Sequence, residues 1–291
     1  FVNLEICRHF LSFLLVLVAV VPISGLSSSS LPKTAFDFAS PYEWDAFYRQ
    51  EAQKHNHDES STPTTTTTTA VVLEWHDSVP LQDIASVVPS DGTCLMVGCG
   101  TSRLPQVLLE RQDPVKEIVL LDTSPTCLEQ LQTIMYGSTK GSTTTSIEYV
   151  CGDATRLSKY FGGNDDDDDA GGVATTTMPR QFDTIIDKGL TDAILCSEGW
   201  DGPLERMILE ATETLVVGTG QYVLISYPLP RSTKEFLVEV GETAGLEWEF
   251  DVRLPLRPPN SANRHVVSSE IPEQTTTSTP RVSIALATRT R

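Results

Sequence analysis

The chain has 291 residues, of which 40% are hydrophobic and 21% are charged, a composition that excludes collagen-like, wholly disordered and multi-span membrane proteins. Its 21 basic residues stand against 39 acidic ones, and the resulting net charge of −18 repels the phosphate backbone of nucleic acids. We therefore expect no nucleic-acid partner. A basic protein substrate fits the charge better, although acidity that merely keeps the protein in solution is the simpler explanation.

The chain opens with a short apolar run over residues 10–23, preceded by basic residues and followed by small ones at 24–30. A membrane-spanning helix needs about 20 apolar residues, so this run is too short to span comfortably. Its pattern is typical of a signal peptide, and a buried core helix or a short anchor is the alternative. We expect residues 1–30 to form a targeting segment and the mature chain to have no stable membrane span. This predicts the secretory pathway or an organelle, and a cytoplasmic location if the segment does not act.

The remainder, residues 31–291, is predicted to form one domain interrupted by low-complexity insertions. These lie at about 58–69, 162–179 and 258–279, where Thr, Asp, Gly, Ser and Pro replace most apolar side chains. Such segments bury too little apolar surface to offset the entropy lost on ordering the chain. We expect them to be surface loops.

Strand and helix patterns alternate along this domain. Buried strands are predicted at 94–97, 118–121, 147–150, 182–186, 222–225, 246–252 and 282–288, and helices at 104–108, 125–135 and 203–215. Alternating strands and helices imply a parallel sheet covered on both faces, whereas the last two strands, without a helix between them, should pair antiparallel. The expected fold is an α/β, Rossmann-like, doubly wound, mostly parallel seven-stranded sheet with an antiparallel last strand at its edge.

Glycine or aspartate follows each of the first four strands, at Gly98–Gly100, Asp122, Asp153 and Asp187. In open α/β sheets, ligands bind beyond these strand ends. The two glycines allow a ligand to approach the backbone, Asp122 can hold two ribose hydroxyls, and Asp153 can accept a hydrogen bond from an exocyclic adenine amine. The sequence therefore predicts a nucleoside pocket.

Nicotinamide dinucleotide is the main rival ligand for such a pocket. Its G-x-G-x-x-G fingerprint requires glycine at position 103, where this chain has Arg103. A turn with so few glycines also offers no cradle for a pyrophosphate. S-adenosylmethionine carries no phosphate, and we expect it to be the cofactor.

The six cysteines form no C-x-x-C pair, and no Cys/His spacing suits zinc. We expect no metal site.

Several segments resemble the seven-strand (class I) S-adenosylmethionine-dependent methyltransferase-like family, in particular the lysine methyltransferases of elongation factor 1-alpha and of citrate synthase. The segments are VGCGTS at 97–102, DTS at 122–124, FDTIIDKGLTDA at 182–193, YEWDAFY at 42–48, EW at 74–75, ISY at 225–227 and 282–287. The resemblance covers about residues 40–290. The chain departs from the family at Thr101, where asparagine is common, and in its insertions.

The resemblance implies the residues that would contact the cofactor. They are Trp44, Tyr48, Trp75, Gly98, Asp122, Thr123, Asp153, Ala154 and Lys188, to which the turn adds Gly100. Three aromatic residues suit this role because a sulfonium cation can lie against aromatic faces. Two alternatives stay open: ordinary helix packing for Trp44 and Tyr48, and a structural ion pair for Lys188.

The resemblance also implies a protein lysine as methyl acceptor. A lysine must be neutral to attack, and with a pKa near 10.4 only about one in a thousand is neutral at pH 7.4, a cost of roughly 4 kcal/mol. We hypothesise that Asp187, or a nearby carbonyl, orients the incoming amine as the catalytic group. The N-P-P-Y string typical of enzymes acting on nucleobases is absent.

Three other functions remain open. The chain could methylate a small molecule, could bind S-adenosylmethionine as a non-catalytic partner subunit, or could be a nicotinamide-dependent oxidoreductase. The acceptor and the oligomeric state do not follow from the sequence.

Overall fold

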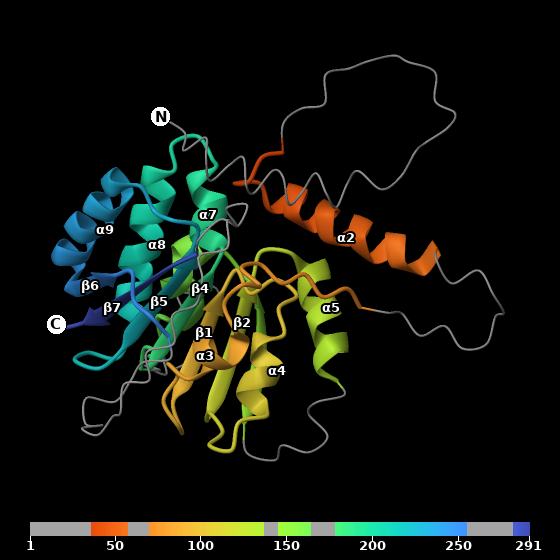
Figure 1. Cartoon of the computed structure of the whole chain (residues 1–291), viewed down its shortest axis with the longest axis horizontal. Helices are drawn as coiled ribbons and strands as arrows, with labels where there is room; N and C mark the ends of the chain where they lie inside the picture. Colours follow the sequence, from red (N-terminus) through yellow and green to blue (C-terminus); the bar gives the residue numbers. More distant parts are fainter. Residues whose placement is uncertain (1–35, 58–69, 137–144, 164–177, 255–281) are drawn as a thin grey trace, which may run out of the picture.

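The computed structural model describes residues 36–57, 70–136, 145–163, 178–254 and 282–291 (Figure 1). The predicted targeting segment and the insertions at 58–69 and 258–279 lie outside the described residues, as does most of the insertion at 162–179. Among the helices of the described parts, none is long and apolar enough to cross a membrane.

Seven strands form one sheet in the order β3-β2-β1-β4-β5-β7-β6. Strands β1 to β5 are parallel where they pair, and β7 is antiparallel to both β5 and β6. The strands are β1 Thr93–Val97, β2 Glu117–Asp122, β3 Ser146–Cys151, β4 Thr184–Lys188, β5 Gln221–Ser226, β6 Leu246–Phe250 and β7 Ser283–Arg289. The Rossmann-like, mostly parallel sheet with an antiparallel last strand is confirmed.

The expected edge position of the last strand is wrong, because β7 lies between β5 and β6. The cause is visible in the burial of the two strands. The first five residues of β7 are all buried, which requires neighbours on both sides and cover on both faces. Strand β6 instead exposes Glu247 and Glu249 and buries mainly the alternate residues, as suits an edge strand.

Helices cover the sheet and one further helix crosses its end. They are α2 Pro41–His57, α3 Leu81–Ala85, α4 Leu104–Leu109, α5 Pro125–Met135, the 3₁₀ turn η1 Ala154–Arg156, α6 Leu157–Phe161, α7 Leu190–Leu195, α8 Asp201–Thr214 and α9 Arg231–Ala244. The three helices predicted in the domain correspond to α4, α5 and α8. Helices α3, α6, α7 and α9 were not predicted from the sequence pattern.

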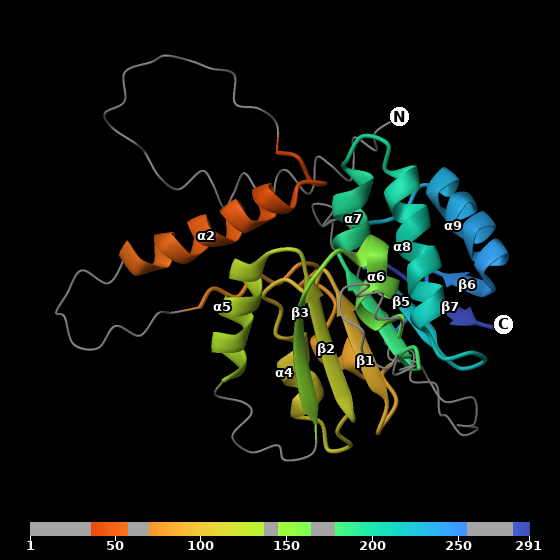
Figure 2. The same cartoon turned by 180° about the vertical axis from the view of Figure 1, so that it is seen from behind.

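Alternate residues of each central strand pack into two separate cores. In β1, Leu95 and Val97 belong to the core beneath α6, α7, α8 and α9, whereas Cys94 and Met96 belong to the core beneath α3, α4 and α5. Figures 1 and 2 show these two sets of helices on opposite faces of the sheet. Because both faces are covered, β1 and β2 are apolar over most of their length, whereas β4 carries Asp187 and Lys188 at its carboxyl end.

Helix α2 lies apart from both layers and crosses one end of the sheet, near α5 and α7 (Figures 1 and 2). Its residues Phe47 and Tyr48 join Leu73 and Trp75 in a third apolar cluster. This cluster positions three aromatic side chains at the end of the sheet where ligands bind in this fold class.

Replacing Leu131 with alanine tests the packing of α5 against the sheet. Leu131 is fully buried in the core beneath α3, α4 and α5, so we expect a loss of about 2–5 kcal/mol in the free energy of unfolding. Urea unfolding measures the loss. Glu129→Ala, at an exposed position of the same helix, should stay within about 0.5 kcal/mol of wild type, and equal effects of the two changes would contradict the assigned packing.

Candidate cofactor and active site

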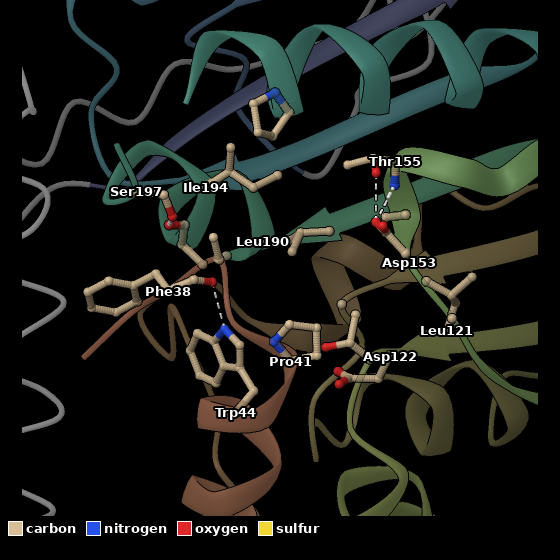
Figure 3. Close-up of a pocket in the computed structure, with 18 of the residues that line it drawn as sticks. Phe38, Pro41, Trp44, Leu121, Asp122, Asp153, Thr155, Leu190, Ile194 and Ser197 are labelled. Carbon is tan, nitrogen blue, oxygen red and sulfur yellow. Dashed lines mark hydrogen bonds between the residues drawn. The ribbon is translucent and has the colours of Figure 1, made fainter. Parts of the chain in front are cut away.

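A cavity of about 280 Å³ lies beyond the carboxyl ends of β1, β2, β3 and β4 (Figure 3). Most of the predicted site residues line it: Trp44, Tyr48, Trp75, Gly98, Asp122, Thr123, Asp153, Ala154 and Lys188. The structure thus brings together residues that lie as many as 144 positions apart in the sequence. Gly100 and Asp187 do not line the cavity.

The turn after β1 forms the floor of the cavity and depends on its two glycines. Gly98 and Gly100 have φ angles of +56° and +54°, in the left-handed region that glycine tolerates best. A Cβ on Gly98 would also lie 2.9 Å from the Cβ of Leu190, so no other side chain fits there without displacing α7. The backbone N–H of Gly100 donates to Oδ2 of Asp122 at 3.0 Å, which connects the ends of β1 and β2.

The Asp122 carboxylate is almost fully buried but keeps acceptor capacity. Its Oδ1 accepts the N–H of Ser124 at 3.0 Å, and its Oδ2 accepts the N–H of Gly100. Burial raises the pKa of Asp122, and these two N–H groups oppose that rise. The Cys127 thiol and the Thr123 N–H are further hydrogen-bond partners. A donor presented from the cavity would therefore share the carboxylate oxygens with these groups.

Asp153, at the end of β3, presents its carboxylate at the wall of the cavity. Its Oδ1 accepts the N–H and the hydroxyl of Thr155, both at 2.8 Å, and about half of the side chain, 47%, is exposed. The phenol of Tyr160 accepts the N–H of Asp153 at 3.1 Å. The turn before Ala154 is therefore fixed, and the other carboxylate oxygen, Oδ2, lies 3.9 Å from Nε of Arg156 in an exposed ion pair.

Three aromatic side chains also line the cavity and are called the aromatic wall below. Trp44 and Tyr48 come from α2, and Trp75 comes from the segment before α3; the rings of Trp44 and Trp75 lie 6.4 Å apart, edge to face. The indole N–H of Trp44 donates to the carbonyl of Phe38 at 3.0 Å. Trp44 and Tyr48 therefore pack as part of α2 and also line the cavity, and their contact with a cofactor stays a prediction.

Helix α2 is fastened to the start of α5 by Asp45. Its Oδ1 accepts the hydroxyl of Ser124 at 2.8 Å and the N–H of Thr126 at 3.1 Å. Burial favours a higher pKa for Asp45, but these hydrogen bonds outweigh it and hold the pKa below its ordinary value. The amide of Gln130 adds a 2.9 Å bond to the carbonyl of Tyr48, so the aromatic wall is held against α5.

The start of α4 is occupied by the side chain of Glu74, a residue that sequence analysis did not assign to the site. Its Oε2 accepts the backbone N–H of Arg103 at 3.0 Å, and its Oε1 accepts the hydroxyl of Ser102 at 2.7 Å. That hydroxyl in turn accepts the N–H of Leu104 at 3.1 Å. In dinucleotide-binding folds a pyrophosphate takes such N–H groups, whereas here the protein's own side chains use them.

Lys188, at the end of β4, joins Glu74 to the aromatic wall. Its ammonium forms an ion pair with Glu74 and donates to the carbonyl of Trp75. Burial lowers the pKa of Lys188, and the Glu74 carboxylate opposes that shift. Lys188 thus makes the structural ion pair that one interpretation predicted, and it also lines the cavity.

Asp187 lies within β4, with its side chain beneath the start of α7 rather than in the cavity. Its carboxylate accepts the N–H of Leu190 at 2.9 Å, the N–H and hydroxyl of Thr191, and the phenol of Tyr222 at 3.0 Å. Burial raises its pKa to about 6. These contacts give Asp187 a structural part in joining β4, β5 and α7, and its orienting role toward an acceptor stays a prediction.

The other half of the cavity is apolar and was not predicted. Figure 3 shows Phe38, Trp44 and Ile194 on one side of the cavity, and the carboxylates of Asp122 and Asp153 on the other. Most of the apolar side comes from α7 and from the residues before α2. In the sequence, only the position of these segments could have indicated that they belong to the site, since they directly adjoin the DKG and YEWDAFY strings.

No protein-family model matches this chain, and no curated protein matches it in sequence. Similar solved structures do exist. A putative rRNA methylase from Clostridium thermocellum has a TM-score of 0.42 and 10% identity, over 72% of this chain and 93% of that one. A precorrin-6y C5,15-methyltransferase from Geobacter metallireducens has a TM-score of 0.40 and 16% identity, over 72% and 85%.

NSun6 from Pyrococcus horikoshii, in a structure with SFG, has a TM-score of 0.47 and 14% identity. The similarity covers 72% of this chain and 51% of NSun6, so this chain corresponds to about half of that protein. These likenesses concern the fold, which the strand order of this chain establishes independently.

Replacing Asp187 with asparagine tests its buried carboxyl. The pKa is raised from 3.8 to about 6 on folding, so between these values the folded chain holds a proton that the unfolded chain has released. The contribution of Asp187 to stability is therefore greatest below the lower pKa and falls as the pH rises through both values. Between about pH 4 and 7, wild type should lose about 2–3 kcal/mol relative to Asp187→Asn in urea unfolding. Parallel pH profiles of the two proteins would contradict this.

Proposed function

We propose that this chain binds S-adenosylmethionine in the cavity and transfers its methyl group to an acceptor. The observation that carries the proposal is the use of the α4 N-terminus by Glu74. A ligand that enters this cavity finds carboxylates and aromatic rings, whereas the backbone N–H groups that would hold a pyrophosphate are already bonded. This supports an adenosine ligand without phosphates over a dinucleotide.

The residues present fit the adenosine part of that cofactor. Asp122 lines the cavity, and its carboxylate oxygens can accept hydrogen bonds from ribose hydroxyls that share them with the protein's own donors. Asp153 can accept from the exocyclic amine of adenine, and Leu121 and Ala154 supply apolar contact. The backbone at Gly98 has no side chain that would obstruct the ligand.

The aromatic wall fits the cationic part of the cofactor. The faces of Trp44, Tyr48 and Trp75 attract a cation electrostatically, by about 0.5–2 kcal/mol per contact depending on desolvation. The bound cofactor would supply an electrophilic methyl group on sulfur, and the chain's own residues would hold it, exclude water and receive the acceptor. Leu190 and Ile194 from α7 provide apolar surface for this exclusion.

A lysine side chain of a protein is the acceptor we propose, on the basis of the motif resemblance. Two segments that carry it make direct contact, since Lys188 of the DKG string binds Glu74 and Trp75 of the EW string. The apolar half of the cavity would favour the neutral amine that must attack. A small-molecule acceptor is the second candidate, favoured by the cavity volume of about 280 Å³ and by the apolar side chains of Phe38, Leu190 and Ile194.

RNA is a less suitable acceptor, although an rRNA methylase is among the similar structures. The net charge of −18 opposes binding of a phosphate backbone. The targeting segment at residues 1–30 leads us to propose the secretory pathway or an organelle as the location.

Calorimetry with S-adenosylmethionine and with its demethylated product tests cofactor binding. Asp122→Asn should bind about 10- to 100-fold more weakly, because a hydrogen bond to a charged group contributes about 1.5–3 kcal/mol. Asp113→Asn, at an exposed acidic position, is the matched control and should bind as wild type does. Saturable binding of a nicotinamide dinucleotide, with none of the methyl donor, would refute the proposal.

Incubation with radiolabelled methyl donor and a lysate of the source cell distinguishes the acceptors. A labelled protein band supports lysine methylation, a labelled small product supports the second candidate, and cofactor binding without turnover identifies a non-catalytic subunit.

A further inference from the structure

A cluster of three side chains, the buried His76 and Asp192 and the half-buried Tyr227, lies next to residues that line the cavity, and the proposed methyl transfer makes no use of it. The imidazole Nε2 of His76 is 2.7 Å from Oδ2 of Asp192, and both side chains are at most 1% exposed. The other oxygen of Asp192 accepts the backbone N–H of Tyr227 at 3.2 Å. The ring of Tyr227 packs edge to face on His76, with centroids 4.8 Å apart.

The backbone of His76 is in a conformation that its residue type rarely adopts. Its φ angle is +56°, in the left-handed region, where a Cβ crowds the following carbonyl. Such a conformation persists when surrounding contacts hold it, and it often occurs beside functional sites. The contact that holds it here is the buried bond from the imidazole to Asp192.

This turn directly follows Trp75 and determines how the tryptophan enters the wall. On one side, the carbonyl of Trp75 accepts a hydrogen bond from Lys188. On the other, His76 is attached to α7. Gly189, which connects β4 to α7, lies close to both Trp75 and His76. A Cβ placed on it would lie 3.6 Å from the Cβ of Trp75 and 3.8 Å from Nε2 of His76. The backbone of Trp75 is thus held between β4 and α7.

We propose that His76 is a positioning residue for the cofactor: Asp192 holds its imidazole, the imidazole holds the left-handed turn, and the turn places Trp75 in the cavity wall. His76 itself does not line the cavity, so it acts through Trp75. The part of this proposal that concerns the cofactor rests on the proposed function, whereas the part that concerns the turn does not.

Two amide substitutions separate the hydrogen bond from the conformation. Glutamine at position 76 places its amide nitrogen near the position of Nε2 and can still donate to Asp192. Asparagine adopts the left-handed conformation more readily than most residues, but its amide nitrogen reaches only the position of Nδ1. We expect His76→Asn to bind S-adenosylmethionine about tenfold more weakly than wild type and His76→Gln to stay within about twofold.

Hydrogen exchange over residues 73–79 measures the turn without any cofactor. The N–H of Val79 bonds to the carbonyl of His76 at 3.1 Å and serves as a reporter. Exchange of this segment should be clearly faster in His76→Asn than in His76→Gln or wild type. Met135→Ala, a buried change in the last turn of α5, is a control for general destabilisation. Under conditions in which it is as stable as His76→Asn, it should show the cofactor binding and the exchange of residues 73–79 of wild type.

The outcomes are distinguishable. Unchanged binding and exchange in both amide variants would overturn the proposal, as would equal losses in both, since the bond to Asp192 would then not be the determinant. If wild type binds no methyl donor, the proposed function fails, and the exchange measurement alone still decides whether His76 holds the turn.

Discussion

The carboxylate of Glu74 is the interaction on which the site depends. It bonds to the turn after β1 through Ser102 and Arg103 and to the end of β4 through Lys188. A single side chain therefore joins two neighbouring strand ends and closes the position that a phosphate occupies in related folds. Lys188 is buried, with 4% of its side chain exposed, whereas 19% of the Glu74 side chain is exposed. Removal of Glu74 would leave the Lys188 ammonium buried without its charged partner, a change that costs up to about 3–5 kcal/mol where a pair is fully buried. Glu74 thus both occupies the position of a phosphate and joins the strand ends that border the cavity.

The remaining walls are added to the sheet by helices that start or end near these strands. Asp45 attaches α2 to α5, and Asp187 attaches α7 to β4 and β5. Each attachment uses a buried carboxylate that accepts several donors, which compensates for its removal from water. Asp45 and Asp187 thus position α2 and α7, which border the apolar side of the cavity.

Local patterns in the sequence predicted the strands and the polar half of the site well. Asp122 and Asp153 follow apolar runs, and the rule that parallel strands end at one edge was sufficient to bring them together. The apolar half was not predictable in this way, because Phe38 and Ile194 meet only through the packing of α2 and α7. The position of the Asp187 side chain was harder still to predict. Strand β4 ends at Lys188, two residues beyond its predicted end. The Asp187 carboxylate therefore lies beneath α7 and not at the edge of the sheet.

The position of β7 has a consequence for the synthesis of the protein. This strand is made after all the others, yet it lies inside the sheet, between β5 and β6. During translation β5 must wait with an open edge, and β6 has no neighbour to pair with, until residues 283–289 have left the ribosome. Unpaired strand edges are prone to associate with other chains. A nascent chain of this fold therefore exposes unpaired strand edges until β7 has emerged and inserted between β5 and β6.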